Sequence, residues 1–194
     1  MTYSLYELAL NPDIQEKARQ EINDVLAKHE GKLTYEAVLE MTYIDQILND
    51  TFKALRKYPP AVFLIRKTAQ DYQVPTTKVI IQKGQEIMIP VYCIHHDPEI
   101  YMNPEPFDPA RFSPKQIRNR HPMTFLGFGD GPRNCIGMRF ARMQTRIGLI
   151  TMLRNYRFKP SSKTVIPFIF DSDMTILTSK GGMHLGVEKN WKLL

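Results

Sequence analysis

The stretch from residue 128 to residue 137 constrains this chain more than any other. It reads FGDGPRNCIG and combines three glycines with one cysteine, Cys135. Glycine permits backbone conformations that other residues avoid, so the chain can turn sharply here. The helix expected directly after Cys135 would point the positive end of its dipole at the sulfur, which favours a thiolate. The stretch therefore predicts a loop that presents an ionised cysteine to a metal; the alternative is a buried structural thiol.

Composition limits the class of protein. The 194 residues are 43% hydrophobic and 24% charged, which suits a single well-packed domain. The net charge of +6 is modest, and the sequence lacks the interleaved basic and aromatic residues of a nucleic-acid-binding module. Two cysteines make no disulfide framework, and no apolar run approaches the roughly 20 residues that span a bilayer. The first residues do not resemble a signal peptide either.

Helices are predicted over about residues 1–57. Residues 1–10 read as the tail of a helix, and Asn11 and Pro12 restart it as a cap and a first helical residue. Apolar side chains then recur at helical spacing up to Gly31, namely Ile14, Ala18, Ile22, Val25 and Leu26. A second helix is expected over about 41–57, ending before two prolines.

The rest of the chain alternates irregular and regular segments. A small sheet is expected over about 60–90, with residues 79–81 and 86–89 paired as a hairpin. Six prolines over about 97–122 predict an irregular loop, which the cysteine-bearing loop 125–137 follows. A long helix over about 137–154 and a terminal sheet over about 155–190 complete a one-domain, mainly α chain with small β-sheets. The apolar stripe of the long helix is expected to be Phe140, Met143, Ile147 and Ile150.

Several motifs resemble the cytochrome P450 family. Residues 128–137 match its haem-thiolate signature F-G-x-G-x-R-x-C-x-G, and residues 107–112, FDPARF, resemble its F-x-P-x-R-F element. The latter lies in the family's proline-rich segment, called the meander, which accounts for residues 97–122. The segments 94–99, 138–141 and 57–60 also resemble sequences of this family. The resemblance is strongest to insect microsomal members that oxidise xenobiotics. The resemblance implies the C-terminal, haem-binding part of the P450 fold over residues 1–194.

The resemblance assigns the site residues. It implies that Cys135 is the catalytic thiolate and the axial ligand of the iron of haem b, with O2 as co-substrate. Residues expected to bind the cofactor are Phe128, Gly129, Gly131, Arg133, Cys135, Gly137 and Arg66. Arg133 can reach one haem propionate as a charge-assisted pair, and Arg66 falls where relatives place a second propionate-binding arginine.

One family element is altered in this sequence. The family pairs an E-x-x-R motif with the meander arginine, here Arg111, but residues 50–58 fit the motif in two registers. Asp50 and Lys53 form D-x-x-K in the first, which we favour; Arg56 supplies the arginine in the second, with Lys53 in place of the acid. About three residues are inserted, so the two ends of one helix cannot keep the same faces. An Arg111 left partly unpaired would cost about 3–5 kcal/mol. In addition, Gly127 replaces a usual proline.

The family resemblance also implies a reaction and its partners. It implies a monooxygenase of a hydrophobic small molecule at the endoplasmic reticulum membrane, with electrons from an NADPH-dependent reductase flavoprotein. Residues 61–65 and 168–175 fall where relatives line the substrate pocket. A basic dock for the reductase is expected from Arg139, Arg142 and Arg146, with Lys115, Arg118 and Arg120 nearby; the alternative is that these charges are only solvated.

The remaining cysteine, Cys93, has no motif around it that assigns a function. Cys93 is expected to be a buried thiol, and His95 and His96 to be structural rather than propionate ligands. Family chains are more than twice as long, so we expect a fragment that lacks the distal wall of the haem pocket and the membrane anchor. The alternative function is a non-catalytic truncated isoform or pseudogene fragment that binds haem weakly or not at all. A basic module for nucleic acid is the reading least supported.

Overall fold

The computed structural model describes residues 1–51, 54–174 and 176–189, without the side chains of residues 49–51, 54 and 55. Its first two helices, α1 (Thr2–Leu10) and α2 (Pro12–Lys28), meet at Asn11. Asn11 is the N-cap residue of α2, as predicted, but its side chain makes no capping bond to that helix. Its Nδ2 donates instead to the carbonyl of Glu7 at 2.8 Å, at the end of α1. Pro12 does begin α2. The predicted apolar face is confirmed, since Ala18, Ile22, Val25 and Leu26 are buried and Ile14 packs partly against the core.

Three helical elements lie between residues 35 and 57. They are α3 (Tyr35–Glu40), α4 (Thr42–Thr51) and α5 (Ala54–Lys57). The predicted single helix over 41–57 corresponds to α4 and α5; residues 52 and 53 between them lie outside the described residues. The sequence analysis missed α3, which Thr34 caps by accepting a hydrogen bond from the N–H of Ala37 at 3.2 Å.

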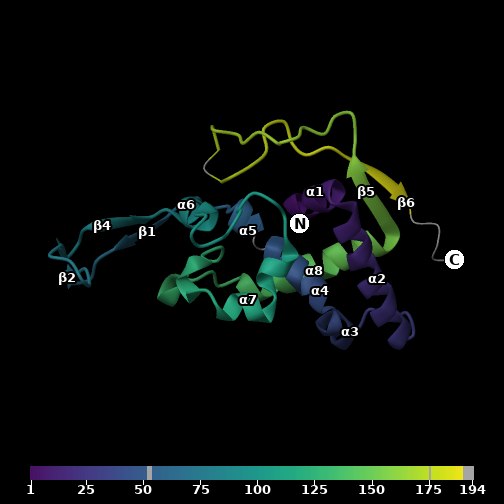
Figure 1. Ribbon diagram of the computed structural model, residues 1–194, viewed down its shortest axis with the longest axis horizontal. Coiled ribbons are helices and arrows are strands. Elements are labelled where there is room, and N and C mark those ends of the chain that lie inside the picture. The colour runs from purple at the N-terminus through teal and green to yellow at the C-terminus, as the bar shows by residue number, and fades with distance from the viewer. Residues whose placement is uncertain (52–53, 175, 190–194) are drawn as a thin grey trace.

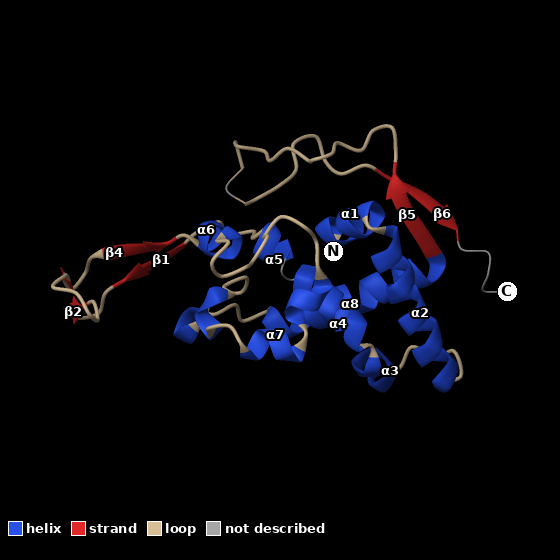
Figure 2. Cartoon of the chain, viewed as in Figure 1, coloured by secondary structure: helices blue, strands red, loops and turns tan. Residues whose placement is uncertain are grey.

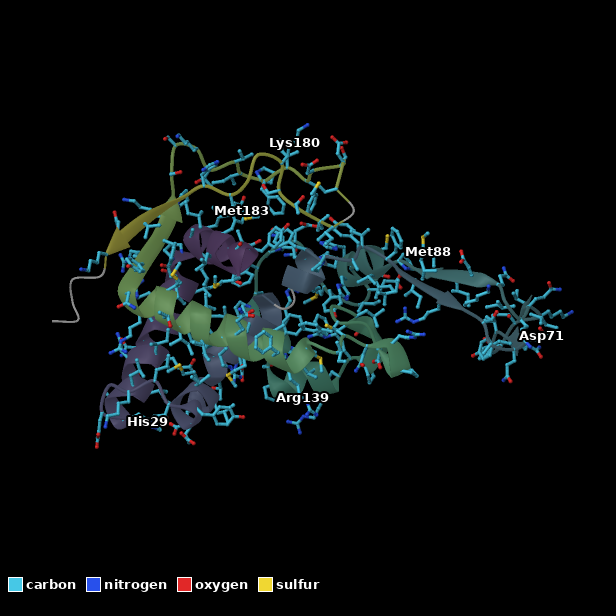
Figure 3. The ribbon with its side chains drawn as sticks, turned by 180° about the vertical axis from the view of Figure 1, so that it is seen from behind. His29, Asp71, Met88, Arg139, Lys180 and Met183 are labelled. Carbon is cyan, nitrogen blue, oxygen red and sulfur yellow. The ribbon has the colours of Figure 1, made fainter. Side chains whose placement is uncertain are left out.

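The sheets pair differently from the prediction. β3 (Ile80–Ile81) pairs with β2 (Tyr72–Gln73), and β4 (Glu86–Ile89) pairs with β1 (Leu64–Lys67), both antiparallel. The expected hairpin of 79–81 with 86–89 is therefore wrong. The β2–β3 hairpin instead continues the β1–β4 hairpin at its far end. Next to β2 and β3, the N–H of Lys83 donates to Asp71 Oδ1 at 2.7 Å. Figure 1 shows this double hairpin projecting from the helical body, with Asp71 near its tip in Figure 3.

The proline-rich segment is more helical than predicted. After α6 (Val91–His96) come three short helices, η1 (Pro109–Phe112), α7 (Pro114–Arg118) and η2 (Pro122–Thr124). Each of these three begins with a proline, a position where the missing N–H costs nothing. The prolines therefore start short helices, and the expectation of no regular element over 97–122 was wrong.

The helix after the cysteine loop forms part of the core. The loop contains a further short helix, η3 (Gly131–Arg133), and α8 (Met138–Asn155) follows. Leu149, Ile150 and Leu153 of α8 are fully buried. The predicted apolar stripe is only partly right, because Phe140 is 72% exposed and Ile147 42% exposed. The buried face instead follows the contacts that α8 makes with α2 and α4.

The chain ends in a small sheet beside the helical core. β5 (Tyr156–Pro160) pairs with β6 (Leu185–Lys189), and the long segment between them arches past α1 (Figure 1). The main hydrophobic core draws its buried residues chiefly from α1, α2, α4 and α8. Figure 2 shows helices in the body and strands at its margins, which confirms a mainly α fold with small β-sheets.

Candidate haem-thiolate site

A cavity of about 550 Å³ lies beside the cysteine loop. Most of its wall is apolar, and it draws residues from α1, the start of β1, the loop and α8. Cys135, Arg133 and Arg66 all line this cavity. The sequence predicted that these three residues share one site, although Arg66 and Cys135 are 69 residues apart. The lining residues are Met1, Tyr3, Tyr58, Pro60, Ala61, Leu64, Arg66, Leu126, Gly127, Phe128, Gly129, Arg133, Cys135, Ala141 and Thr145.

Backbone hydrogen bonds fix the shape of the loop. The N–H of Cys135 donates to the carbonyl of Phe128 at 2.8 Å, which folds the two ends of the motif together. Gly129 and Gly131 have φ values of +70° and +74°, in the region that side chains disfavour. An added Cβ on Gly129 would meet its neighbours no closer than 3.8 Å, so φ rather than space requires glycine there.

Cys135 stands just before a helix N-terminus. Its sulfur is exposed and forms no disulfide, and its carbonyl accepts a hydrogen bond from the N–H of Met138 at 3.3 Å. Gly137 precedes α8, and no side chain caps that end of the helix. The positive end of the helix dipole therefore lies close to Cys135, where it stabilises negative charge.

The two candidate propionate ligands come from different segments, β1 and the loop. Arg66 Nη2 would lie 3.8 Å from a Cβ on Gly129, and Arg133 belongs to η3 within the loop itself. In β1, Leu64 and Arg66 are half-buried while Ile65 and Lys67 are exposed, as alternation along a strand requires. Arg66 Nη1 donates to the carbonyl of Ile65 at 3.0 Å. This arrangement places two guanidinium groups and one thiol around a single apolar cavity.

The meander arginine is held by its own segment. Arg111 Nη1 donates to the carbonyl of Met102 at 2.6 Å, and Nη2 donates to that of Asn103 at 2.7 Å. Arg111 Nε also lies 3.8 Å from a carboxylate oxygen of Asp108. Main-chain carbonyls of the meander therefore receive both terminal nitrogens of Arg111, whereas its buried Nε has no hydrogen-bond partner among the described residues.

Arg56 lies on the inner side of the same meander. It is fully buried, and it donates from Nη1 to the carbonyl of His95 at 3.0 Å and from Nη2 to that of Pro104 at 2.7 Å. Arg56 is the arginine of the register that counts back from Tyr58; that register and the D-x-x-K register both stay predictions. The side chain of Asp50 and all of Lys53 lie outside the described residues.

His95 connects α6 to the start of the cysteine loop. Its ring is fully buried, its Nε2 accepts a hydrogen bond from the N–H of Leu126 at 2.9 Å, and it stacks on Phe125. The sequence suggested a structural role for His95 but gave no sign of this partner. Val91 and His95 face inward one helical turn apart, which leaves Cys93 on the outer face of α6. The prediction that Cys93 is buried was therefore wrong: it is exposed.

Replacing His95 with phenylalanine is expected to destabilise the chain by about 1–3 kcal/mol. Phenylalanine keeps an aromatic ring against Phe125 but leaves the buried N–H of Leu126 without its acceptor. Urea denaturation followed by circular dichroism measures the change. His184→Phe is the control, because His184 is exposed; equal stabilities of the two variants would refute the role of His95.

The predicted substrate segments divide between two cavities. Ala61 and Leu64 line the large cavity. Phe168 and Phe170, in contrast, line a separate cavity of about 200 Å³ together with Tyr58, Tyr92 and His96. Thr175, at the end of the predicted turn 168–175, lies outside the described residues.

Three of the predicted docking arginines share one hollow. Arg139, Arg142 and Arg146 line about 400 Å³ together with Tyr35 and Asp45, and Arg146 forms an ion pair with Asp45. Burial lowers the pKa values of Arg142 and Arg146 below that of a free guanidinium. Arg139 is exposed and extends away from α8 in Figure 3.

The other basic residues expected nearby are partly structural. Arg120 donates to the carbonyl of Arg111 and lies over the ring of Tyr101, at 4.7 Å from its centroid. Arg118 Nε donates to the carbonyl of Pro114 at 3.2 Å, and Lys115 lies on the same short helix. Arg120 therefore braces the meander and adds little to an open basic surface.

Comparison with known proteins agrees with this geometry. The family model described as Cytochrome P450 matches residues 1–185. The chain is 50% identical over 190 residues to the protein named "Probable cytochrome P450 6a14" of Drosophila melanogaster, an alignment that covers 97% of this chain and 37% of the relative. It is 46% identical over 192 residues to "Cytochrome P450 6A1" of Musca domestica, with the same two coverages. It is also 46% identical over 187 residues to "Cytochrome P450 6B1" of Papilio polyxenes, covering 96% of this chain and 37% of the relative.

The chain spans little more than a third of the length of the curated relatives it matches. Among its described residues, no helix is long and apolar enough to cross a membrane.

Proposed function

Because this chain belongs to the cytochrome P450 family, we propose that it is the haem-binding part of a monooxygenase acting on a hydrophobic small molecule. The observation that carries the proposal is the convergence of Cys135, Arg133 and Arg66 on one apolar cavity. A thiolate, two cations and an apolar wall are the groups that a haem with two propionates requires.

The residues of the cavity fit haem b. Leu64, Leu126 and Ala141 offer apolar contact to a macrocycle, and Arg66 and Arg133 offer a charged partner to each propionate. Phe128, Gly129, Gly131 and Gly137 form the loop that presents Cys135. Bound there, haem would supply the activation of O2 and the transfer of one oxygen atom to a substrate.

The chain's own residues have separate tasks in this proposal. Cys135 Sγ would hold the iron, and the N-terminus of α8 would direct the positive end of its dipole toward that site. The hydrogen bond from the N–H of Cys135 to the carbonyl of Phe128 would keep the two ends of the loop together and so hold Cys135 in place. Ala61 and Leu64 would contact the substrate through their apolar side chains.

Electrons would come from an NADPH-dependent reductase flavoprotein. The hollow lined by Arg139, Arg142 and Arg146 supports this part of the proposal, because three guanidinium groups line it and Arg139 among them is exposed. A basic surface attracts an acidic partner over distances of about 10 Å at moderate salt. The whole protein would act at the endoplasmic reticulum membrane, as its resemblance to insect microsomal members implies.

Arg139→Glu is expected to slow the first electron transfer from the reductase by about tenfold at low salt. The variant reverses the charge of an exposed residue in the basic hollow, so the association rate falls while folding is unaffected. Stopped-flow reduction of the haem-loaded chain at several salt concentrations measures the effect. Lys78→Glu, an equal charge reversal on the exposed double hairpin, is the control; equal rates for the two variants at all salt concentrations would place the dock elsewhere.

Oxygen incorporation tests the function itself. The haem-loaded chain is incubated with NADPH, reductase, oxygen-18 gas and naphthalene, and the products are analysed by mass spectrometry. Naphthol that carries one oxygen-18 atom supports a monooxygenase. Stable haem binding without labelled product would overturn catalysis by this chain and favour the alternative, a non-catalytic haem-binding fragment.

A further inference from the structure

A buried carboxylate joins α1 to the segment after α5. Glu7 is only 3% exposed and lies among buried apolar residues of α1. Its Oε1 accepts a hydrogen bond from the hydroxyl of Tyr58 at 2.5 Å and lies 2.8 Å from Lys57 Nζ. An unpaired charge at such a site would be costly, so these two contacts fix residues 57 and 58 against α1.

Tyr58 extends this contact into an aromatic cluster. Its ring stacks on Tyr3 with centroids 4.8 Å apart and meets Phe168 edge-on at 4.7 Å. Tyr58 lines both the large cavity and the smaller one that holds Phe168 and Phe170. The ring therefore forms part of the wall between the two cavities. Burial and the charge of Glu7 both raise the pKa of Tyr58, so its hydroxyl remains a donor.

The same region of α1 holds the long segment before β6. The hydroxyl of Tyr3 donates to the carbonyl of Leu177 at 2.7 Å, and that of Tyr6 donates to the carbonyl of Val165 at 3.0 Å. The N–H of Leu177 donates in turn to the carbonyl of Pro60 at 3.2 Å. Between the ends of this segment the described residues show one isolated bridge, Phe170 with Ser179. The position of the segment between β5 and β6 therefore depends strongly on its contacts with α1 and Pro60.

We propose that Glu7, Lys57 and Tyr58 are positioning residues, which hold residues 60–64 and the turn at Phe168 in a fixed relation beside the cavity. The proposal rests on the proposed function, since it concerns the two segments assigned to substrate. Neither Glu7 nor Tyr58 would touch the haem iron or the reacting oxygen. They act indirectly, by fixing the positions of residues 60–64 and of the turn at Phe168. The positions of these two segments determine the shape of the space that a hydrophobic substrate would occupy.

Hydrogen exchange on the chain tests the contact directly. Tyr58→Phe keeps the ring and removes the donor to Glu7. Exchange at the amides of Leu177 and Lys180 is expected to become about tenfold faster, since a hydrogen bond to a charged group is lost, while α2 and α8 remain unchanged. Glu7→Leu, which removes both contacts, is expected to give at least the same local effect. Tyr72→Phe, on the exposed hairpin, is the control; unchanged exchange in Tyr58→Phe, or equal acceleration throughout the chain, would overturn the proposal.

Ligand binding separates this proposal from the proposed function. Glu7 lines the smaller cavity and not the one proposed for haem, so the hemin affinity of Glu7→Leu is expected to equal that of the wild type, whereas naphthalene binding to the haem-loaded variant weakens by about tenfold. Equal naphthalene affinities would overturn the positioning role while leaving haem binding intact. Failure of the wild-type chain itself to bind hemin would instead overturn the proposed function, and the exchange result would still decide whether the three residues hold the two segments.

Discussion

Arg56→Met is expected to destabilise the chain by about 2–6 kcal/mol, because one buried and one partly buried carbonyl lose a charged donor at about 1–3 kcal/mol each. Those carbonyls belong to His95 and Pro104, so the loss falls where α5 meets α6 and the meander. Such a change is a large part of the stability of an ordinary domain. Urea denaturation followed by circular dichroism gives the free energy of unfolding.

Two further variants make the Arg56 experiment specific. Arg56→Lys keeps the charge but lacks the fork that reaches both carbonyls, so it should recover only about half of the loss. Arg118→Met removes an exposed arginine and should change stability by less than about 0.5 kcal/mol. An Arg56→Met variant as stable as Arg118→Met would contradict the role of Arg56.

Cys135→Ser is expected to lower hemin affinity by at least about 100-fold, since even residues that only support a metal ligand contribute about 10–100-fold. The serine hydroxyl is a poor substitute for a thiolate as an iron ligand. Absorbance titration with hemin measures the affinity. Cys93→Ser removes the other exposed thiol and should bind as the wild type does; equal losses in both variants would mean that hemin binds through no particular cysteine.

The sequence predicted the parts whose constraints are local. The spacing of apolar residues along α2 follows from helix geometry, and two glycines of the cysteine loop are at positive φ. Fixed spacing within residues 128–137 was enough to identify the family that the comparisons then showed. The position of Arg66 beside the loop could be expected only through that resemblance, because 69 residues separate it from Cys135.

Features that depend on distant contacts were beyond the sequence analysis. The pairing of β2 with β3 involves two residues in each strand, too few to produce an alternating pattern. Phe140 and Ile147 are apolar, yet the described residues leave both largely exposed, since α8 turns Leu149, Ile150 and Leu153 toward the core. Glu7 was also missed, although one signal was present: it is an acidic residue within a run of apolar residues, Leu5, Tyr6, Leu8 and Ala9.

The central claim is that Cys135 ligates haem iron as a thiolate, and the carbon monoxide difference spectrum of the reduced, hemin-reconstituted chain tests it most directly. We expect a strongly red-shifted band in the wild type and in Cys93→Ser, and no such band in Cys135→Ser. A band typical of histidine or neutral thiol ligation in the wild type, or no haem binding, would refute thiolate ligation by Cys135.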